Sequence, residues 1–412
     1  MTMNTKRRRR HDRLAALPGV KAVRRPVSPG SDELFDLFYV RTGRKSAHPV
    51  VIIPGGPGVA SVRLYRGLRR RAAAAGLDVL MIEHRGVGMS RHTDAGADLP
   101  AEAITVDQVL DDIAAVLDDA VVNEAVLYGT SYGSYLAAGF GVRHPARVAA
   151  MVLDSPLLST GDMAAMRTAI RDLLWDGADP QTAVLAPKVR VLVENGMFER
   201  SGGQLAGLLY GFGGATLLGR QLDLLLGGRT RLWSALGRLD RLTTRKTPYR
   251  NETDLVARIA FRELNYAGTP DGLPLDPALE MHEMAGGACA HEPFETEPYD
   301  LVAEMPKFDW PTVIISGGRD LTTPPVIAER IASLVPDAEL VRLATAAHSV
   351  LDTRERAALA IIGAVCNGAA GQLPAIAAEL DALPARPAVR LMVSVIGAAA
   401  ALESVLPARP TL

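Results

Sequence analysis

Short, uninterrupted hydrophobic runs alternate with longer amphipathic stretches along the first third of the chain. The runs at 50–53 and 79–82 are apolar at every position, which is typical of strands buried on both faces of a sheet. Longer stretches between such runs have the three-to-four-residue spacing of helices. The expected strands are 34–40, 50–53, 79–82, 125–128 and 148–153, and the expected helices are 64–75, 106–117 (with Thr105 as its N-cap) and 131–142. This order predicts a mainly parallel sheet flanked by helices.

The alternation stops near residue 157 and resumes at Pro311. The intervening segment has helical patterns at 163–174, 217–236 and 255–263, and no convincing strand. After it come an expected strand at 312–316, a helix at 325–334 and a strand at 339–343. We therefore expect an α/β fold with an inserted helical cap. Its parts are a basic N-terminal arm at 1–33, a core at 34–156 and 306–370, a cap at 157–305 and a C-terminal helical extension at 371–412.

The composition acts mainly by excluding classes of protein. Hydrophobic residues make up 48% of the 412 positions and the formal net charge is −1, which excludes a disordered chain and any strong field toward nucleic acid. The two cysteines, Cys289 and Cys366, form no CxxC pair and are too few for a disulfide scaffold or a metal cluster. We expect no metal and no organic cofactor.

The two ends of the chain give no targeting signal. The N-terminal sequence MTMNTKRRRRHDR is not followed by the apolar stretch and cleavage site of a secretory signal. Its arginine run is expected to be a solvated tail. The late apolar stretches at 357–365 and 391–402 are shorter than the ~20 residues that a membrane span needs. These features predict a cytoplasmic protein with no nucleic-acid or membrane partner.

The strongest chemical signal is the G-x-S-x-G pentapeptide from Gly129 to Gly133, which follows an expected strand and precedes an expected helix. A strand that runs directly into a helix forces a tight turn at Ser131. Glycines two positions before and two after remove the Cβ atoms that would collide there. The hydroxyl would then project above the sheet beside the N–H groups of the first helical turn. Ser131 is therefore the candidate nucleophile; the alternative is a glycine-rich turn with an incidental serine.

A serine hydroxyl needs a general base, and the base needs an orienting acid. Of eight histidines, only His348 follows the last expected strand, in a loop of small residues. Asp320 follows the 312–316 strand, at the edge where functional groups of open α/β sheets gather. Asp154, also just past a strand, is its rival. We prefer Asp320 because Ser131, Asp320 and His348 then follow the chain order Ser, Asp, His.

A second glycine-rich element, PGGPG at 54–58, directly follows the 50–53 run. It lacks the third glycine of a dinucleotide loop and the lysine of a phosphate-binding loop. Beside a serine nucleophile, such a loop supplies backbone N–H groups to a developing oxyanion. We therefore expect Gly56 and Tyr132 to form the oxyanion hole, with Gly55 as the alternative to Gly56.

These motifs together resemble the α/β-hydrolase superfamily, and within it the proline iminopeptidase-like serine aminopeptidases (S33 peptidases). The resemblance rests on VVIIPGGPG, IEHRGVGMS, TVDQVLDDI, LYGTSYGSYLAAGFGVRHPARVAAMVLDS, ISGGRDLTTPP and TAAHS, and it covers about 34–156 and 305–352. It implies release of an N-terminal residue, often proline, through an acyl-enzyme. Pro54, Glu83-His84 and Ala347 replace residues that are usual in the family.

In that family, acidic cap residues hold the free ammonium of the substrate. By this resemblance, Glu263 in Arg262-Glu263-Leu264-Asn265-Tyr266 and Glu292 in Cys289-Ala290-His291-Glu292 are the candidates. A buried pair of carboxylates facing the serine would favour peptide substrates.

The sequence therefore predicts a serine hydrolase that acts on a small peptide or small acyl substrate, most simply an aminopeptidase. Two alternatives remain open. One is a carboxylesterase or another small-molecule acyl hydrolase with an apolar cap. The other is a non-catalytic binding protein that keeps the fold.

Overall fold

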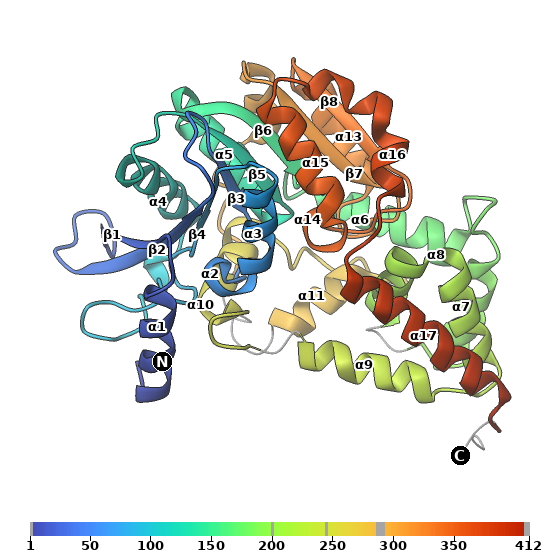
Figure 1. The fold of residues 1–412 in the computed structure, drawn as a ribbon. Helices are drawn as coiled ribbons and strands as arrows, with labels where there is room; N and C mark the ends of the chain where they lie inside the picture. The colour runs from blue at the N-terminus through green and yellow to red at the C-terminus, as the bar shows by residue number, and fades with distance from the viewer. Residues whose placement is uncertain (1–2, 199–201, 244–245, 286–292, 408–412) are drawn as a thin grey trace.

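The computed structural model describes residues 3–198, 202–243, 246–285 and 293–407, and its centre is one eight-stranded sheet (Figure 1). The strand order is β1-β2-β4-β3-β5-β6-β7-β8. β2 pairs antiparallel with both of its neighbours, and every pair from β4 to β8 is parallel. The strands are β1 (Val20–Pro26), β2 (Leu34–Thr42), β3 (Val50–Ile53), β4 (Val79–Ile82), β5 (Ala125–Thr130), β6 (Val148–Asp154), β7 (Thr312–Gly317) and β8 (Ala338–Leu343). The predicted fold class, a mainly parallel sheet flanked by helices, is confirmed.

Helices cover both faces of the sheet, because its central strands are apolar on both sides. One face packs against α4 (Val106–Asp119), α5 (Tyr132–Arg143) and α13 (Pro325–Leu334). The other packs against α2, α3, α15 and their neighbours. The bounds on that second face are α2 (Ser61–Leu64), α3 (Arg66–Ala74), α14 (Val350–Thr353), α15 (Glu355–Cys366) and α16 (Ala377–Ala382). Thr105 caps α4 as predicted, since its side chain accepts from the N–H of Gln108.

The segment between β6 and β7 is helical in its described part and forms a layer beside the sheet (Figure 1). It has a hydrophobic cluster of its own, built largely from α7, α8 and the π-helical turn η3 (Asp172–Asp176). Its helices are α6 (Asp162–Arg171), α7 (Leu185–Glu194), α8 (Gly202–Leu226), α9 (Arg231–Thr243), α10 (Thr253–Arg258) and α11 (Pro277–Ala285), with the short α12 (Leu301–Glu304) before β7. We call the part from α6 to α11 the cap.

The N-terminal segment is folded, not the loose arm expected from its charge. α1 (Thr5–Ala15) leads into β1, which pairs along its whole length with β2. The buried Arg7 side chain contacts Glu252 of the cap at 2.6 Å and donates to the carbonyl of Gly88 at 2.9 Å. The sequence suggested a solvated tail because β1 is a charged edge strand with little buried surface, and because the partner of Arg7 lies 245 residues away.

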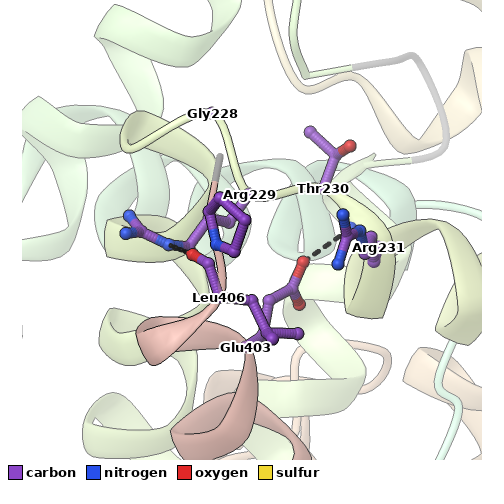
Figure 2. Close-up of a pocket in the computed structure, with 7 residues that line it drawn as sticks. Gly228, Arg229, Thr230, Arg231, Glu403 and Leu406 are labelled. Carbon is purple, nitrogen blue, oxygen red and sulfur yellow. Dashed lines mark hydrogen bonds between the residues drawn. The ribbon is translucent and has the colours of Figure 1, made fainter. Parts of the chain in front are cut away.

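The C-terminal extension is an integral part of the cap's packing. α17 (Pro387–Val405) lies along α8, and its Ile396 enters the cap's hydrophobic cluster. Figure 2 shows where it meets the turn between α8 and α9: Glu403 accepts from the backbone N–H of Arg231 at 2.7 Å. The other carboxylate oxygen of Glu403 accepts from the next N–H, at Leu232. Glu403 therefore caps the start of α9 from a distant part of the chain.

One further expectation fails in this region, and a second element has other bounds than expected. The single helix predicted at 217–236 is two helices, because α8 ends at Leu226 and Gly228 takes a left-handed φ of 70° before α9 begins. The apolar stretch at 391–402 is part of the longer α17. This 19-residue helix is, by length and composition only, the one described helix that could cross a membrane, and little of it is buried.

Candidate active site

The serine of the pentapeptide lies at the turn between β5 and α5. Ser131 has φ 53° and ψ −124°, a left-handed conformation that is uncommon for a residue with a side chain. The flanking glycines make the turn possible: a Cβ on Gly129 would lie 2.2 Å from the carbonyl oxygen of Gly133. A Cβ on Gly133 would lie 2.1 Å from the carbonyl oxygen of Ile53, at the end of β3. A side chain at either glycine would therefore collide with the backbone, as the sequence analysis predicted.

Three side chains far apart in the sequence meet at this edge of the sheet. The Nε2 atom of His348 lies 2.9 Å from the Oγ of Ser131, and its Nδ1 lies 2.9 Å from Oδ2 of Asp320. Ser131 follows β5, Asp320 follows β7 and His348 follows β8. The carboxyl ends of parallel strands thus bring together the nucleophile, base and acid that the sequence suggested.

The buried Asp320 carboxylate is held in its charged form. Its Oδ1 accepts from the N–H groups of Thr322 and Thr323, and its Oδ2 from the hydroxyl of Thr323. Burial alone would raise the pKa of Asp320, but the interaction with His348 and these hydrogen bonds outweigh it and lower the pKa. Burial likewise disfavours the imidazolium of His348, whereas the charge of Asp320 favours it, with a net rise in the pKa of His348.

Asp154, the rival candidate acid, has a different set of partners. Its carboxylate accepts from the N–H groups of Val350 and Leu351 and from the hydroxyl of Tyr128. These bonds anchor the first turn of α14, immediately after His348. Asp154 therefore fixes the position of the loop that carries the imidazole, whereas Asp320 bonds to the imidazole itself.

The glycine-rich loop after β3 approaches the serine closely. Gly56 lines the same cavity as Ser131, and a Cβ on Gly55 would lie 3.1 Å from the Cβ of Ser131. Tyr132 is the first residue of α5, so its N–H has no partner within the helix. The positions of Gly56 and Tyr132 are compatible with the predicted oxyanion hole.

Glu83 holds the start of the helix that comes after the glycine-rich loop. It stands in the segment where the sequence departs from the family, and its fully buried Oε2 accepts from the N–H groups of Ser61 and Val62, at 2.6 and 2.9 Å. Those donors form the first turn of α2, which directly follows the glycine-rich loop. Burial raises the pKa of Glu83 to about 7, although these bonds act in the opposite direction.

A cavity of about 350 Å³ opens between the sheet edge and the cap beside Ser131 and His348. Much of its wall is apolar and comes from the cap and the loop after β6. These apolar residues are Leu157, Met163, Met166, Leu264, Tyr266 and Met281. The cavity can therefore hold a small apolar group against the serine.

Two carboxylates, Asp162 and Glu297, also line this cavity. Asp162 accepts through Oδ2 from the N–H groups of Leu158 and Ser159, and Glu297 accepts through Oε2 from the N–H of Thr160. The Oε1 atom of Glu297 is buried and has no hydrogen-bond partner among the described residues. Burial raises the pKa of Glu297 and raises that of Asp162 to about 6, where the nearby charge of Glu297 adds to the effect. The pair has the character of an incomplete cation site.

Of the two predicted substrate-binding glutamates, the one that the structure describes is not found here. Glu263 does not line the cavity: its Oε2 accepts from the N–H of Val106 at 2.9 Å, capping α4, and its Oε1 bonds to Arg262. The next three residues, 264–266, do line it. Glu292 and Cys289 lie outside the described residues.

Sequence reasoning missed Asp162 and Glu297. Asp162 had a usable signal, since it begins α6 and follows the end of β6, at the active edge of the sheet, by eight residues. Glu297 lies in an irregular segment with no such signal. Within the described ranges, no group of three His, Cys, Asp or Glu side chains could hold a metal ion.

Comparison with known proteins is informative over part of the chain. Residues 48–182 match the model of the alpha/beta hydrolase fold family. A probable proline iminopeptidase of Streptomyces coelicolor is 26% identical over 137 residues, or 33% of this chain and 41% of that protein. A proline iminopeptidase of Arabidopsis thaliana is 28% identical over 131 residues, or 31% of this chain and 32% of that protein. The matches thus cover less than half of the length of these two relatives.

Solved structures with a similar chain path include hydrolases of more than one kind. Proline iminopeptidase of Mycobacterium smegmatis has 16% identity and a TM-score of 0.47, covering 85% of this chain and 99% of that one. A thermophilic esterase from Thermogutta terrifontis has 14% identity and a TM-score of 0.46, with the same coverage.

Proposed function

This chain is an α/β hydrolase that resembles the proline iminopeptidases, and from that premise we propose that it is a serine aminopeptidase. It would release an N-terminal residue, such as proline, from a short peptide through an acyl-enzyme. The hydrogen-bonded series Ser131, His348 and Asp320 supports the reaction type. The carboxylates in the same cavity support the substrate class.

The geometry supports a two-step mechanism. His348 Nε2, 2.9 Å from the serine hydroxyl, takes its proton as Oγ attacks the carbonyl carbon of the N-terminal residue. The N–H groups of Gly56 and Tyr132 would stabilise the oxyanion. The C–N bond breaks as His348 returns the proton to the leaving amine. His348 then removes a proton from water, which attacks the acyl-enzyme and regenerates Ser131. Asp320 stabilises the imidazolium in both steps.

The observation that carries the aminopeptidase assignment is the unmatched pair Asp162 and Glu297. Both residues are half-buried, but a buried carboxylate oxygen such as Oε1 of Glu297 is costly unless a cation or a hydrogen bond compensates for it. Thr160 satisfies only one oxygen of Glu297, and the two carboxylates repel each other. The ammonium of an N-terminal residue would compensate both charges while its carbonyl lies against Ser131. An apolar ester would leave both charges uncompensated, which makes a carboxylesterase the less favoured alternative.

The test compares proline naphthylamide with a p-nitrophenyl ester that lacks an amine. We expect the wild type to prefer the naphthylamide, and Ser131→Ala to lose turnover by on the order of 10⁶-fold, as nucleophile removal does in serine proteases. A fluorophosphonate should label the wild type at Ser131 and leave the variant unlabelled. Near-wild-type turnover in Ser131→Ala would refute the nucleophile. An enzyme that cleaves the ester alone would refute the aminopeptidase assignment. Absence of both labelling and turnover would favour a binding protein.

A further inference from the structure

A second cavity, of about 190 Å³, adjoins the one that contains Ser131. The two share Met166, Met281, Thr322 and His348 as wall residues, but the second is not lined by Ser131 or Gly56. In the proposed reaction, the acyl part of the substrate must contact the serine and the oxyanion donors. The leaving amine must contact the histidine that protonates it. The second cavity therefore has the position expected for the residue after the scissile bond. We call it the leaving-group chamber.

Along α8 the wall of the leaving-group chamber is mainly apolar, with Gln204 as its polar residue. Gly203, Gly207 and Gly211 recur at one-turn intervals, so no side chains project from that strip of the helix. The backbone comes close to the histidine loop, since a Cβ on Gly211 would lie 3.1 Å from the Cβ of Ala347. The remaining apolar wall consists of Ile170, Leu208, Phe212, Pro277 and Leu321. Such a chamber suits an aliphatic or aromatic side chain.

Among the described residues that line this chamber, Arg319 is the one arginine or lysine. It directly precedes Asp320, and its backbone N–H donates to the carbonyl of Ala346 at 2.9 Å. The guanidinium packs where α8 bends at Gly214: a Cβ on that glycine would lie 3.0 Å from the Arg319 Cζ. Gly214 has φ 66° and ψ −171°, a conformation that residues with a side chain rarely adopt, and this glycine leaves room for the guanidinium at the bend in α8.

Arg319 differs from several other arginines of the chain in having no counter-ion among the described residues. Arg85, Arg91 and Arg262 each form an ion pair within 3.0 Å. Arg319 is half-buried, and no carboxylate of the described residues lies within ion-pairing distance of it. Within the described part of the chain, neither the acidic pair of the first cavity nor the guanidinium of the second has an ion-pair partner, and His348 lines both cavities.

We propose that the leaving-group chamber binds the second residue of a dipeptide and that Arg319 pairs with its free α-carboxylate. This inference rests on the proposed aminopeptidase function and narrows its substrate class to dipeptides with an apolar second residue. A dipeptide has an ammonium at one end and a carboxylate at the other, which matches the two uncompensated charges of the site. Guanidinium and carboxylate pair well because both groups are planar and can form two parallel hydrogen bonds. Arg319 is thus a specificity residue, and the chemical step is the hydrolysis described above.

The experiment compares prolyl-leucine with prolyl-leucinamide, which differ only in the C-terminal charge. In the wild type we expect kcat/KM to be about 10- to 100-fold higher for the free carboxylate, the range for a charge-assisted hydrogen bond. In Arg319→Met the ratio of the two values should fall to about one, and Arg319→Lys should restore part of it. The ratio is measured within each variant, so partial unfolding does not change it. Arg342→Met removes an exposed arginine of β8 and should keep the wild-type ratio.

Three results of this experiment would overturn the role of Arg319. A wild-type ratio near one, or a ratio that Arg319→Met leaves unchanged, would overturn it, while cleavage of proline naphthylamide would leave the aminopeptidase assignment standing. If the ratio of the two kcat/KM values fell as much in Arg342→Met as in Arg319→Met, the inference would also be overturned. The preference for the free carboxylate would then reflect the net charge of the protein. If the wild type cleaves esters but neither peptide nor naphthylamide, the aminopeptidase proposal is wrong and this inference fails with it.

Discussion

Glu263 and Glu297 are two glutamates of the segment between β6 and β7, and burial raises the pKa of both. They differ in what their oxygens contact. Glu263 has a donor on each oxygen, the N–H of Val106 on one and the guanidinium of Arg262 on the other. Glu297 has the N–H of Thr160 on one oxygen and no described donor on the other. A fully bonded carboxylate stabilises the fold, whereas one with an unused oxygen beside a cavity can bind a ligand.

This difference explains why the sequence predicted the wrong glutamate as the substrate-binding residue. Glu263 stands in a stretch whose next three residues do line the cavity, so its position along the chain was nearly right. Its side chain, however, points to the start of α4 and satisfies a helix terminus there. The backbone N–H that this carboxylate contacts belongs to a residue more than 150 positions away in the sequence.

Of the two glutamates, Glu297 should have the larger effect on catalysis when it is substituted. In Glu297→Gln the ammonium of the substrate loses its charged partner, and we expect kcat/KM for proline naphthylamide to fall about 10²-fold. The p-nitrophenyl ester has no ammonium, so the naphthylamide-to-ester ratio should fall by a similar factor. Steady-state kinetics on both substrates checks this, with the exposed Glu194→Gln on α7 as a matched control. An unchanged ratio in Glu297→Gln would remove Glu297 from substrate recognition.

Substitution of Glu263 should instead lower stability. Glu263→Ala removes the acceptor for the N–H of Val106 and leaves the buried Arg262 without its closest partner. We expect a loss of about 1–3 kcal/mol in the free energy of unfolding, measured by urea denaturation. The naphthylamide-to-ester ratio should match that of the wild type. A lower ratio without loss of stability would return Glu263 to the substrate site and contradict the contrast with Glu297.

The core was predictable because its signals are local. A run such as Val50–Ile53 is apolar at every position, and β3 has those bounds in the structure. Ser131, Asp320 and His348 each follow a strand, and parallel strands place their carboxyl ends at one edge, so their meeting followed from the topology.

The cap and the termini were less predictable because their contacts are distant. α1 depends on an ion pair between Arg7 and Glu252, and the start of α9 on a carboxylate from α17. The incomplete pair Asp162 and Glu297 is brought together from the start of α6 and from an irregular segment more than 130 residues further along the chain. No spacing rule relates residues at such separations, so their roles emerge only from the fold.

The smallest predicted effect is a difference in pH dependence between activity on the naphthylamide and activity on the ester. His348 must be neutral to accept the serine proton, and its pKa is raised because Asp320 outweighs burial. Activity on both substrates should therefore be present at high pH and fall as pH drops through a value above 6.5. Binding of an ammonium also needs ionised carboxylates, and the pKa of Asp162 is about 6. Protonation of Asp162 below that value should weaken binding of the naphthylamide but not of the ester.

At pH 5, one unit below the pKa of Asp162, about nine-tenths of that carboxyl is protonated, so the naphthylamide should lose up to about tenfold more kcat/KM than the ester. Profiles of kcat/KM from pH 5 to 8 measure the difference. On the acidic side, kcat/KM should fall more steeply for the naphthylamide than for the ester. In Asp162→Asn the extra acidic loss should be reduced, because the titrating group is gone. Identical pH profiles for the two substrates in the wild type would show that Asp162 does not need to be charged for binding of the ammonium.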